Sequence, residues 1–224
     1  MDEILLIDKP AGMSSFGVVA RVRRLLSEQA GRKVKVGHTG TLDPFATGLL
    51  ILLTGKNTKR SNDFLKLDKW YETTIRLGAI SSTGDIEGEI KEYSSGFLRP
   101  DLSDVKQCLK SFIGEVEQRV PQYSAVKING KRAYKLAREG KEVEMPIRKV
   151  QIYQIDLIDY KWPELKIRCH VSSGTYIRTL GEDIGKKLGV FGYLTKLRRT
   201  KIGNYDIKDA IKLEDWMKNR GCSS

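Results

Sequence analysis

Two segments in which side chains alternate between two faces constrain the fold of this chain more than any other feature. In residues 70–77 and 165–171 every second side chain falls on the same face, and most residues of that face are apolar. Such alternation is typical of strands in antiparallel sheets, with one buried and one solvated face. Apolar residues also recur at helical spacing in 18–26, 103–113 and 175–188. Because strands and helices do not follow a regular βαβ order, we expect an α+β fold with a largely antiparallel sheet.

The composition excludes several classes of protein. The 224 residues are 40% hydrophobic and 30% charged, which excludes a disordered chain. No apolar run approaches the roughly 20 residues that span a bilayer, and acidic residues near the N-terminus exclude a signal peptide. The chain has no internal repeat and no Pro/Gly-rich linker. We therefore expect a single domain over residues 1–224 that does not associate with a membrane.

The cysteines and histidines indicate the compartment and the absence of a metal site. Cys108, Cys169 and Cys222 are far apart and odd in number, which argues against a disulfide framework and for a reducing compartment. With only His38 and His170 besides, no Cys/His cluster has the spacing of a zinc site. We expect a cytoplasmic protein without a metal.

The charge of the chain indicates a partner. It carries 40 Lys and Arg against 28 Asp and Glu, a net charge of +12. The basic residues form clusters, and the densest one contains Lys127, Lys131, Arg132, Lys135 and Arg138. Such clusters neutralise phosphates, so the pattern favours a nucleic acid partner. The alternative is that the charge only keeps the protein soluble.

A glycine-punctuated segment, residues 37–48, is the first candidate for an active site. It reads Gly-His-Thr-Gly-Thr-Leu-Asp-Pro-Phe-Ala-Thr-Gly. Pro44 restricts Asp43 to an extended backbone, which keeps the carboxylate out of a helix. A rigid loop that presents Asp43 beside His38 can serve as a catalytic site. The residues alone leave open the alternative of a simple Asp-Pro turn.

Residues 172–180 form the second candidate segment, between a predicted strand and a predicted helix. Tyr176 and Arg178 fall in the first helical turn, where backbone N–H groups attract anions and an arginine needs an acidic partner. The alternative is that Arg178 is an ordinary solvated side chain. The role of Tyr71 is also left open. A tyrosine on an apolar strand face either belongs to the core or provides a surface on which a base can stack.

Six segments together resemble the TruB-type tRNA pseudouridine synthases. They occur in the family's order, span most of the chain and include the highly specific Gly-His-Thr-Gly-Thr-Leu-Asp-Pro. The segments are Leu6–Ser15, Gly37–Pro44, Lys69–Glu72, Val120–Lys127, Ser173–Thr179 and Leu197–Arg199. The resemblance implies a pseudouridine synthase fold, with a central mixed, largely antiparallel sheet flanked by helices. It also implies an isomerase without a cofactor that converts uridine 55 in the T-loop of tRNA to pseudouridine.

The resemblance assigns the chemistry to a carboxylate and an arginine. Asp43 matches the family's catalytic aspartate, and Arg178 matches the arginine that pairs with it. Such a pair would keep the acid ionised. The carboxylate either attacks C1′ or removes the 2′ proton, and the sequence leaves both routes open.

The remaining site residues implied by the resemblance contact the substrate base. His38 matches the loop histidine near the flipped uridine, and Tyr71 matches the aromatic residue that packs on the target base. Tyr176 and Leu197 match positions that contact uracil. Because the target uridine is stacked inside folded RNA, it must be extruded before it can react.

The chain departs from the family pattern in two places. Position 82 is Ser where members commonly carry an acid, so no role is assigned to residues 81–88, although Asp85 keeps a second acid. Many members also carry a C-terminal RNA-binding PUA domain, and this chain shows no evident counterpart. We therefore expect RNA affinity to come from the catalytic domain and a basic insertion at about 120–147.

The expected partner is the T-stem-loop of tRNA, bound by a monomer without an obligate protein partner. One alternative is a guide-dependent relative that acts on ribosomal RNA, and another is a non-catalytic RNA chaperone. The Gly-His-Thr-Gly form of the loop argues against the first. The presence of Asp43, Tyr71 and Arg178 together argues against the second.

Overall fold

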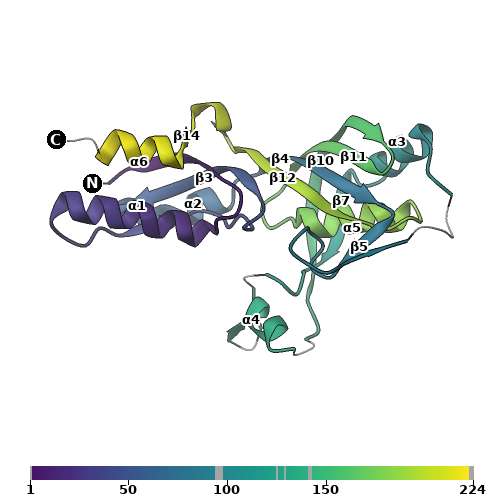
Figure 1. The fold of residues 1–224 in the computed structure, drawn as a ribbon, viewed down its shortest axis with the longest axis horizontal. Helices are drawn as coiled ribbons and strands as arrows, with labels where there is room; N and C mark the ends of the chain where they lie inside the picture. Colours follow the sequence, from purple (N-terminus) through teal and green to yellow (C-terminus); the bar gives the residue numbers. More distant parts are fainter. Residues whose placement is uncertain (1, 94–97, 125, 129, 141–142, 222–224) are drawn as a thin grey trace. The chain divides into compact units, whose positions relative to one another are not determined.

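The computed structural model describes residues 2–93, 98–124, 126–128, 130–140 and 143–221 (Figure 1). The chain divides into two compact units. The first unit comprises Met1–Glu72 and Lys196–Ser224, and the second comprises Thr73–Thr195. Strands β4 (Lys69–Leu77) and β12 (Gly192–Ile202) each run from one unit into the other.

The first unit is built on a mixed sheet with helices packed against it. Besides parts of β4 and β12 it contains β1 (Ile4–Lys9), α1 (Ser15–Ala30), β2 (Val36–His38), β3 (Thr47–Thr54), η1 (Gly55–Arg60), α2 (Ser61–Leu65), β13 (Tyr205–Asp206), η2 (Ile207–Asp209), β14 (Ile211–Lys212) and α6 (Leu213–Gly221). Strand β3 pairs antiparallel with β1 and β2 but parallel with β12. Strand β1 also pairs parallel with β14. The predicted combination of helices with a mixed sheet is confirmed.

Helix α1 forms as its sequence predicts. The Ser14 side chain caps it by accepting the N–H of Gly17 at 3.0 Å, and Gly31 ends it with a left-handed φ of 61°. Its predicted apolar face, which includes Val18, Val22 and Leu26, is buried. No helix in the described part of the chain is long and apolar enough to cross a membrane.

Strand β3 is apolar along its length because both of its faces are covered. One face packs with α1 and α6 in a cluster of Ile7, Val18, Val19, Val22, Leu26, Val34, Leu50, Leu52, Leu213 and Trp216. The opposite face packs in a second cluster of Leu49, Ile51, Leu53, Phe64 and Ile202. Each apolar residue of β3 therefore contributes to one of two cores, which holds the strand firmly in place.

The second unit contains a sheet in the order β12-β4-β11-β10-β7. Its elements, besides parts of β4 and β12, are β5 (Ala79–Ser81), β6 (Ile90–Glu92), α3 (Leu102–Lys110), β7 (Gly114–Arg119), β8 (Lys127–Ile128), β9 (Lys131–Arg132), α4 (Ala133–Arg138), β10 (Ile147–Lys161), β11 (Glu164–Val171) and α5 (Ile177–Lys187). Strands β10 and β11 form a hairpin around Trp162-Pro163, because they pair antiparallel up to Lys161 opposite Glu164.

Two local features of the second unit, the end of helix α3 and the turn between β8 and β9, can be compared with what the sequence predicts. Helix α3 ends at Lys110, three residues before the predicted end at Ile113, because the N–H groups of Phe112 and Ile113 donate to the carbonyls three residues earlier instead of four. The dipeptide Asn129-Gly130 predicts a turn, and strands β8 and β9 on either side of it pair antiparallel. Asn129 itself lies outside the described residues.

Candidate active site

Asp43 lies on the loop between β2 and β3, the Asp43 loop (residues 39–46). The N–H of Ala46 donates to the carbonyl of Asp43 at 3.1 Å, which closes a turn with Pro44 at its second position. The Asp-Pro turn considered from the sequence therefore exists, and it is closed through the backbone carbonyl of Asp43. Asp43 is half-buried.

The segment before α1 fixes the far side of this loop. The hydroxyl of Ser15 donates to the carbonyl of Leu42 at 3.0 Å and accepts its N–H at 2.8 Å. The fully buried ammonium group of Lys9 donates to the carbonyl of Pro44 at 3.1 Å, and the N–H of Gly12 donates to the same oxygen at 2.9 Å. These bonds leave the backbone on both sides of Asp43 little freedom to move.

His38, at the end of β2, is half-buried beside the loop. Its Nδ1 accepts the N–H of Gly40 at 3.3 Å, which assigns the ring proton to Nε2. Burial, followed by the nearby positive charge of Arg199, lowers the pKa of His38 below its ordinary value. The imidazole is therefore neutral at physiological pH, with an N–H available as a hydrogen-bond donor.

Tyr71 on β4 and Leu197 on β12 are both buried. Their strands are neighbours in the sheet, and within the first unit the hydroxyl of Thr200 on β12 donates to the carbonyl of Trp70 on β4 at 3.4 Å. The first unit thus holds four predicted site residues, namely His38, Asp43, Tyr71 and Leu197. The other two, Tyr176 and Arg178, belong to the second unit.

Arg178, in the first turn of α5, is buried among acceptors of the second unit. Its Nη1 donates to the carbonyl of Thr83 at 2.9 Å and its Nη2 to the carbonyl of Tyr123 at 2.8 Å. Its Nε lies 3.5 Å from Oδ2 of Asp85, and both side chains are less than 10% exposed. The acidic partner that the sequence required of an arginine at this position therefore includes Asp85.

Asp85 is a site residue that sequence reasoning missed. Its Oδ1 accepts the hydroxyl of Thr83 at 2.6 Å and the N–H of Glu87 at 3.0 Å, so the carboxylate is fixed before it meets Arg178. The sequence assigns no role to residues 81–88, because Ser82 departs from the family pattern. One feature of the sequence points to such an acid. Arg178 is a cation in the first turn of a helix, where it needs a negatively charged partner from another part of the chain.

Tyr176 is the N-cap residue of α5, and its backbone is bound by a side chain from another element. The amide of Gln118, buried on β7, donates to the carbonyl of Tyr176 at 3.2 Å and accepts its N–H at 3.0 Å. The half-buried Tyr176 packs against a cluster formed by Val120, Ala133 and Met145. Gln118 therefore positions Tyr176, and nothing in its own sequence neighbourhood indicates that role.

The basic insertion predicted at about 120–147 contains the hairpin β8–β9 and helix α4. Its residues Lys127, Lys131, Arg132 and Lys135 are exposed. Exposed cations of this kind can bind the phosphates of a nucleic acid.

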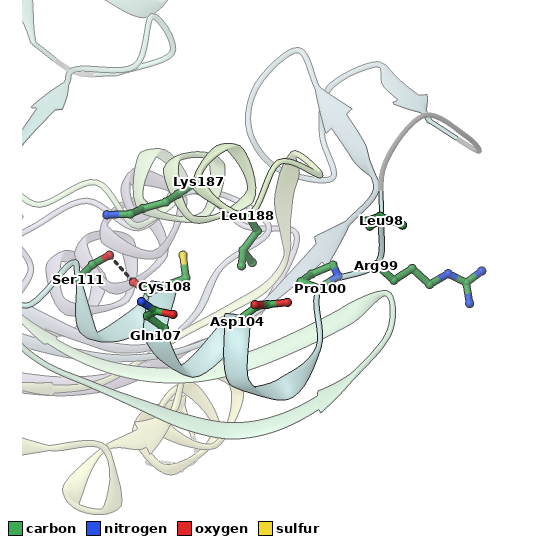
Figure 2. Close-up of a pocket in the computed structure, with 9 residues that line it drawn as sticks. All are labelled: Leu98, Arg99, Pro100, Asp104, Gln107, Cys108, Ser111, Lys187 and Leu188. Atoms are coloured by element: carbon green, nitrogen blue, oxygen red, sulfur yellow. Dashed lines mark hydrogen bonds between the residues drawn. The ribbon is translucent and has the colours of Figure 1, made fainter.

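A cavity of about 520 Å³ in the second unit contains none of the predicted site residues (Figure 2). Figure 2 shows Cys108 of α3 facing it, with Lys187 and Leu188 from the end of α5 on another wall. Burial raises the pKa of the Cys108 thiol, so the group stays protonated and unreactive. Among the described residues, no group of three or more Asp, Glu, His or Cys side chains could hold a metal ion.

Comparison with known families gives a match over nearly the whole chain. The model for the N-terminal domain of TruB family pseudouridylate synthases matches residues 23–177. The model for the C-terminal domain of tRNA pseudouridylate synthase B matches residues 178–220. The six predicted site residues lie inside these two matches.

Two curated relatives are named tRNA pseudouridine synthase B. The protein of Caldicellulosiruptor saccharolyticus is 45% identical over 214 residues, which are 96% of this chain and 72% of that protein. The protein of Phocaeicola vulgatus is 43% identical over 216 residues, which are 96% of this chain and 91% of that protein.

Solved structures are similar as well. A Cbf5-Nop10-Gar1 complex contains a chain that is 28% identical, with a TM-score of 0.71 over 98% of this chain. An H/ACA RNP bound to a substrate RNA containing 2′-deoxyuridine contains one that is 26% identical, with a TM-score of 0.70 over 99% of this chain. In both cases this chain covers 56% of the other, so it spans about half the length of these solved chains. The predicted fold class is confirmed.

Proposed function

Since this chain belongs to the TruB family of pseudouridylate synthases, we propose that it converts uridine 55 in the T-loop of tRNA to pseudouridine. The C1′–N1 bond breaks, the uracil turns and a C1′–C5 bond forms, while the proton lost from C5 is balanced by one gained at N1. The observation that supports this most directly is the Asp43 loop, in which hydrogen bonds on both sides hold one carboxylate in place.

The proposed catalytic group is the ionised carboxylate of Asp43. It either attacks C1′ or removes the 2′ proton, and both routes need a deprotonated acid. We assign to Arg178 the role of pairing with Asp43, which stabilises the ionised form. The bonds of Arg178 to Thr83, Tyr123 and Asp85 hold its guanidinium in one orientation within the second unit.

The remaining site residues are proposed to receive the flipped base. Tyr71 would stack on the uracil, and stacking on an aromatic ring contributes about 1–3 kcal/mol per base. His38, neutral with its proton on Nε2, would donate one hydrogen bond to RNA. Tyr176 and Leu197 would contact the edge of the uracil. Together these contacts offset the stacking that the uridine loses when it leaves the folded RNA.

The proposed substrate is tRNA, bound by a monomer in the cytoplasm. The curated relatives named for tRNA are 43–45% identical to this chain, against 26–28% for the chains from H/ACA complexes. This difference favours the tRNA activity over a guide-dependent activity on ribosomal RNA. The net charge of +12 implies that affinity for RNA falls steeply as salt rises.

The proposal is tested with an isolated T-stem-loop RNA. The protein is incubated with it in the absence of guide RNA and of other proteins, and pseudouridine is mapped by carbodiimide-dependent stops in primer extension. We expect one stop, at the position of uridine 55. Asp43→Asn is the matched control, because it keeps the shape of the side chain and should bind the RNA normally without modifying it. No stop with the unaltered protein, or a stop at another uridine, would contradict the proposal.

A further inference from the structure

The side chain of Arg199 on β12 is buried at a place where no role has been assigned. It is 1% exposed, and its guanidinium is charged at any physiological pH. Its Nε donates to the carbonyl of Leu49 at 2.8 Å, and its Nη2 donates to the carbonyl of Gly40 at 3.1 Å. Burying a charge is unfavourable unless its surroundings compensate it. The cost of burying Arg199 therefore suggests that the residue has a role in the protein.

The two carbonyls that Arg199 binds lie on either side of Asp43 in the sequence. Gly40 is near the start of the Asp43 loop, and Leu49 follows the loop in β3, where it pairs with Asp8 of β1. Leu49 is therefore fixed by the sheet, whereas Gly40 lies in the loop. One planar guanidinium thus connects the start of the loop to the strand after it.

The backbone of Arg199 also pairs with the strand directly after the loop. Strand β12 pairs with β3 through Arg199 opposite Gly48. A Cβ atom at Gly48 would lie 2.3 Å from the carbonyl oxygen of Arg199, and Gly48 has a φ of 104°. Glycine is therefore required for this close approach. Both the side chain and the backbone of Arg199 hold the ends of the segment that carries Asp43.

We propose that Arg199 is a positioning residue that holds the Asp43 loop in its reactive geometry. The inference rests on the proposed function and adds a residue that acts through the loop without touching the substrate. A misplacement of about 1 Å at a reacting group can cost on the order of 10²-fold in rate. Lysine cannot donate to both carbonyls in the same way, because its ammonium is a single point on a flexible stem.

The kinetic test compares Arg199→Lys with the unaltered protein on the T-stem-loop RNA. We expect kcat to fall by about 10- to 100-fold while KM changes by less than about threefold, because the loop is displaced and the RNA surface is intact. Arg220→Lys is the matched control. It makes the same replacement in the same unit, at a guanidinium that pairs with Glu3 at 2.8 Å, and should leave kcat unchanged.

Two structural readouts separate this inference from the proposed function, since neither requires activity. Hydrogen exchange at the amides of Leu42 and Ala46 should accelerate about tenfold or more in Arg199→Lys, and not in Arg220→Lys. In Arg199→Met, which removes the charge, the imidazole of His38 should titrate at higher pH in NMR spectra. The chain has two histidines, so His170 serves as the internal reference.

The outcomes that overturn the inference are specific. Wild-type kcat and wild-type amide exchange in a folded Arg199→Lys protein would show that the loop holds its geometry without the guanidinium. Failure of both Arg199 variants to fold would show that the residue serves the stability of the first unit as a whole. If the unaltered protein makes no pseudouridine but the exchange and titration changes appear, the proposed function fails while the positioning of the loop stands.

Discussion

Arg178 and Arg199 are both buried arginines, but the two units of the molecule accommodate them differently. Arg178 in the second unit has a carboxylate, Asp85, 3.5 Å from its Nε in addition to two backbone carbonyls. Arg199 in the first unit donates to two carbonyls, and none of the described carboxylates pairs with it. An ion pair cancels most of the field of a buried charge, whereas carbonyl dipoles leave part of it in place.

The difference shows in the groups around each arginine. The charge of Arg199 contributes to lowering the pKa of His38, and it also acts on Lys69, whose pKa is about 8 mainly because of burial. The first unit therefore keeps a positive field beside the loop that carries Asp43. The second unit instead uses a carboxylate to fix the direction of a guanidinium. The roles that we propose for the two arginines differ accordingly: Arg199 positions the loop and contributes its charge, whereas Arg178 presents donors in a fixed direction.

The largest expected effect comes from Arg178→Lys. The ammonium cannot reproduce the fixed fork of donors to Thr83 and Tyr123, and we expect kcat on the T-stem-loop RNA to fall by about 10²–10³-fold. Arg76→Lys is the control, because Arg76 forms an exposed pair with Glu92 in the same unit. A near-normal rate for Arg178→Lys in single-turnover kinetics would contradict the assignment that the fixed direction of the guanidinium donors is needed for the reaction.

Gly48→Ala tests the first unit. The added Cβ would overlap the backbone of Arg199, and the φ of 104° is unfavourable for alanine. We expect the free energy of unfolding to fall by more than about 3 kcal/mol in urea titrations. Gly31→Ala is the matched control, because Gly31 also has a positive φ but no atom lies near its Cβ position. Its free energy of unfolding should fall by only about 1 kcal/mol. If both variants lose the same free energy of unfolding, the close approach of β12 to Gly48 does not exclude a side chain at that position.

Most of the local structure could be predicted from the sequence, because its determinants are local. The Ser14 cap, the alternation in β4 and the hairpin β10–β11 each depend on residues near one another in the chain. The parallel pairing of β12 with β3 could not be predicted in this way. It joins Arg199 to Gly48, about 150 residues away, and leaves no short-range pattern.

The residues of the candidate site also fall into two groups: those that a local sequence pattern identifies, and those that depend on contacts with distant parts of the chain. Asp43 and His38 lie in one short segment whose glycines and proline mark it, so the sequence identifies them. Asp85 and Gln118 act on α5 from distant loops and strands, and Arg199 reads as an ordinary strand residue in a basic run. Their roles depend on tertiary contacts, which only the structure shows.

Asp85→Asn makes Arg178 more like Arg199, and so tests the comparison itself. The amide keeps the shape of the side chain but leaves the guanidinium without this charge partner. We expect a loss of about 2–3 kcal/mol in the free energy of unfolding, because removing one partner of a buried pair leaves the other charge uncompensated. Glu92→Gln, at the exposed pair with Arg76, should cost less than about 1 kcal/mol. Equal small losses would mean that carbonyl acceptors alone are sufficient for Arg178.

The smallest expected effect is the pH dependence contributed by His38. Its pKa in the folded protein lies below the ordinary value of about 6.5, so between these two values the unfolded chain binds more protons than the folded one. The stability that His38 contributes is therefore complete above about pH 6.5 and decreases as the pH falls through that value. Comparing His38→Gln with the unaltered protein in urea titrations at pH 7 and pH 5 should show a difference below about 1 kcal/mol, with the unaltered protein losing more at pH 5. Because removing the charge of Arg199 raises the pKa of His38, this difference should shrink in Arg199→Met. If it does not, burial alone sets the pKa, and Arg199 acts on the loop only through its hydrogen bonds.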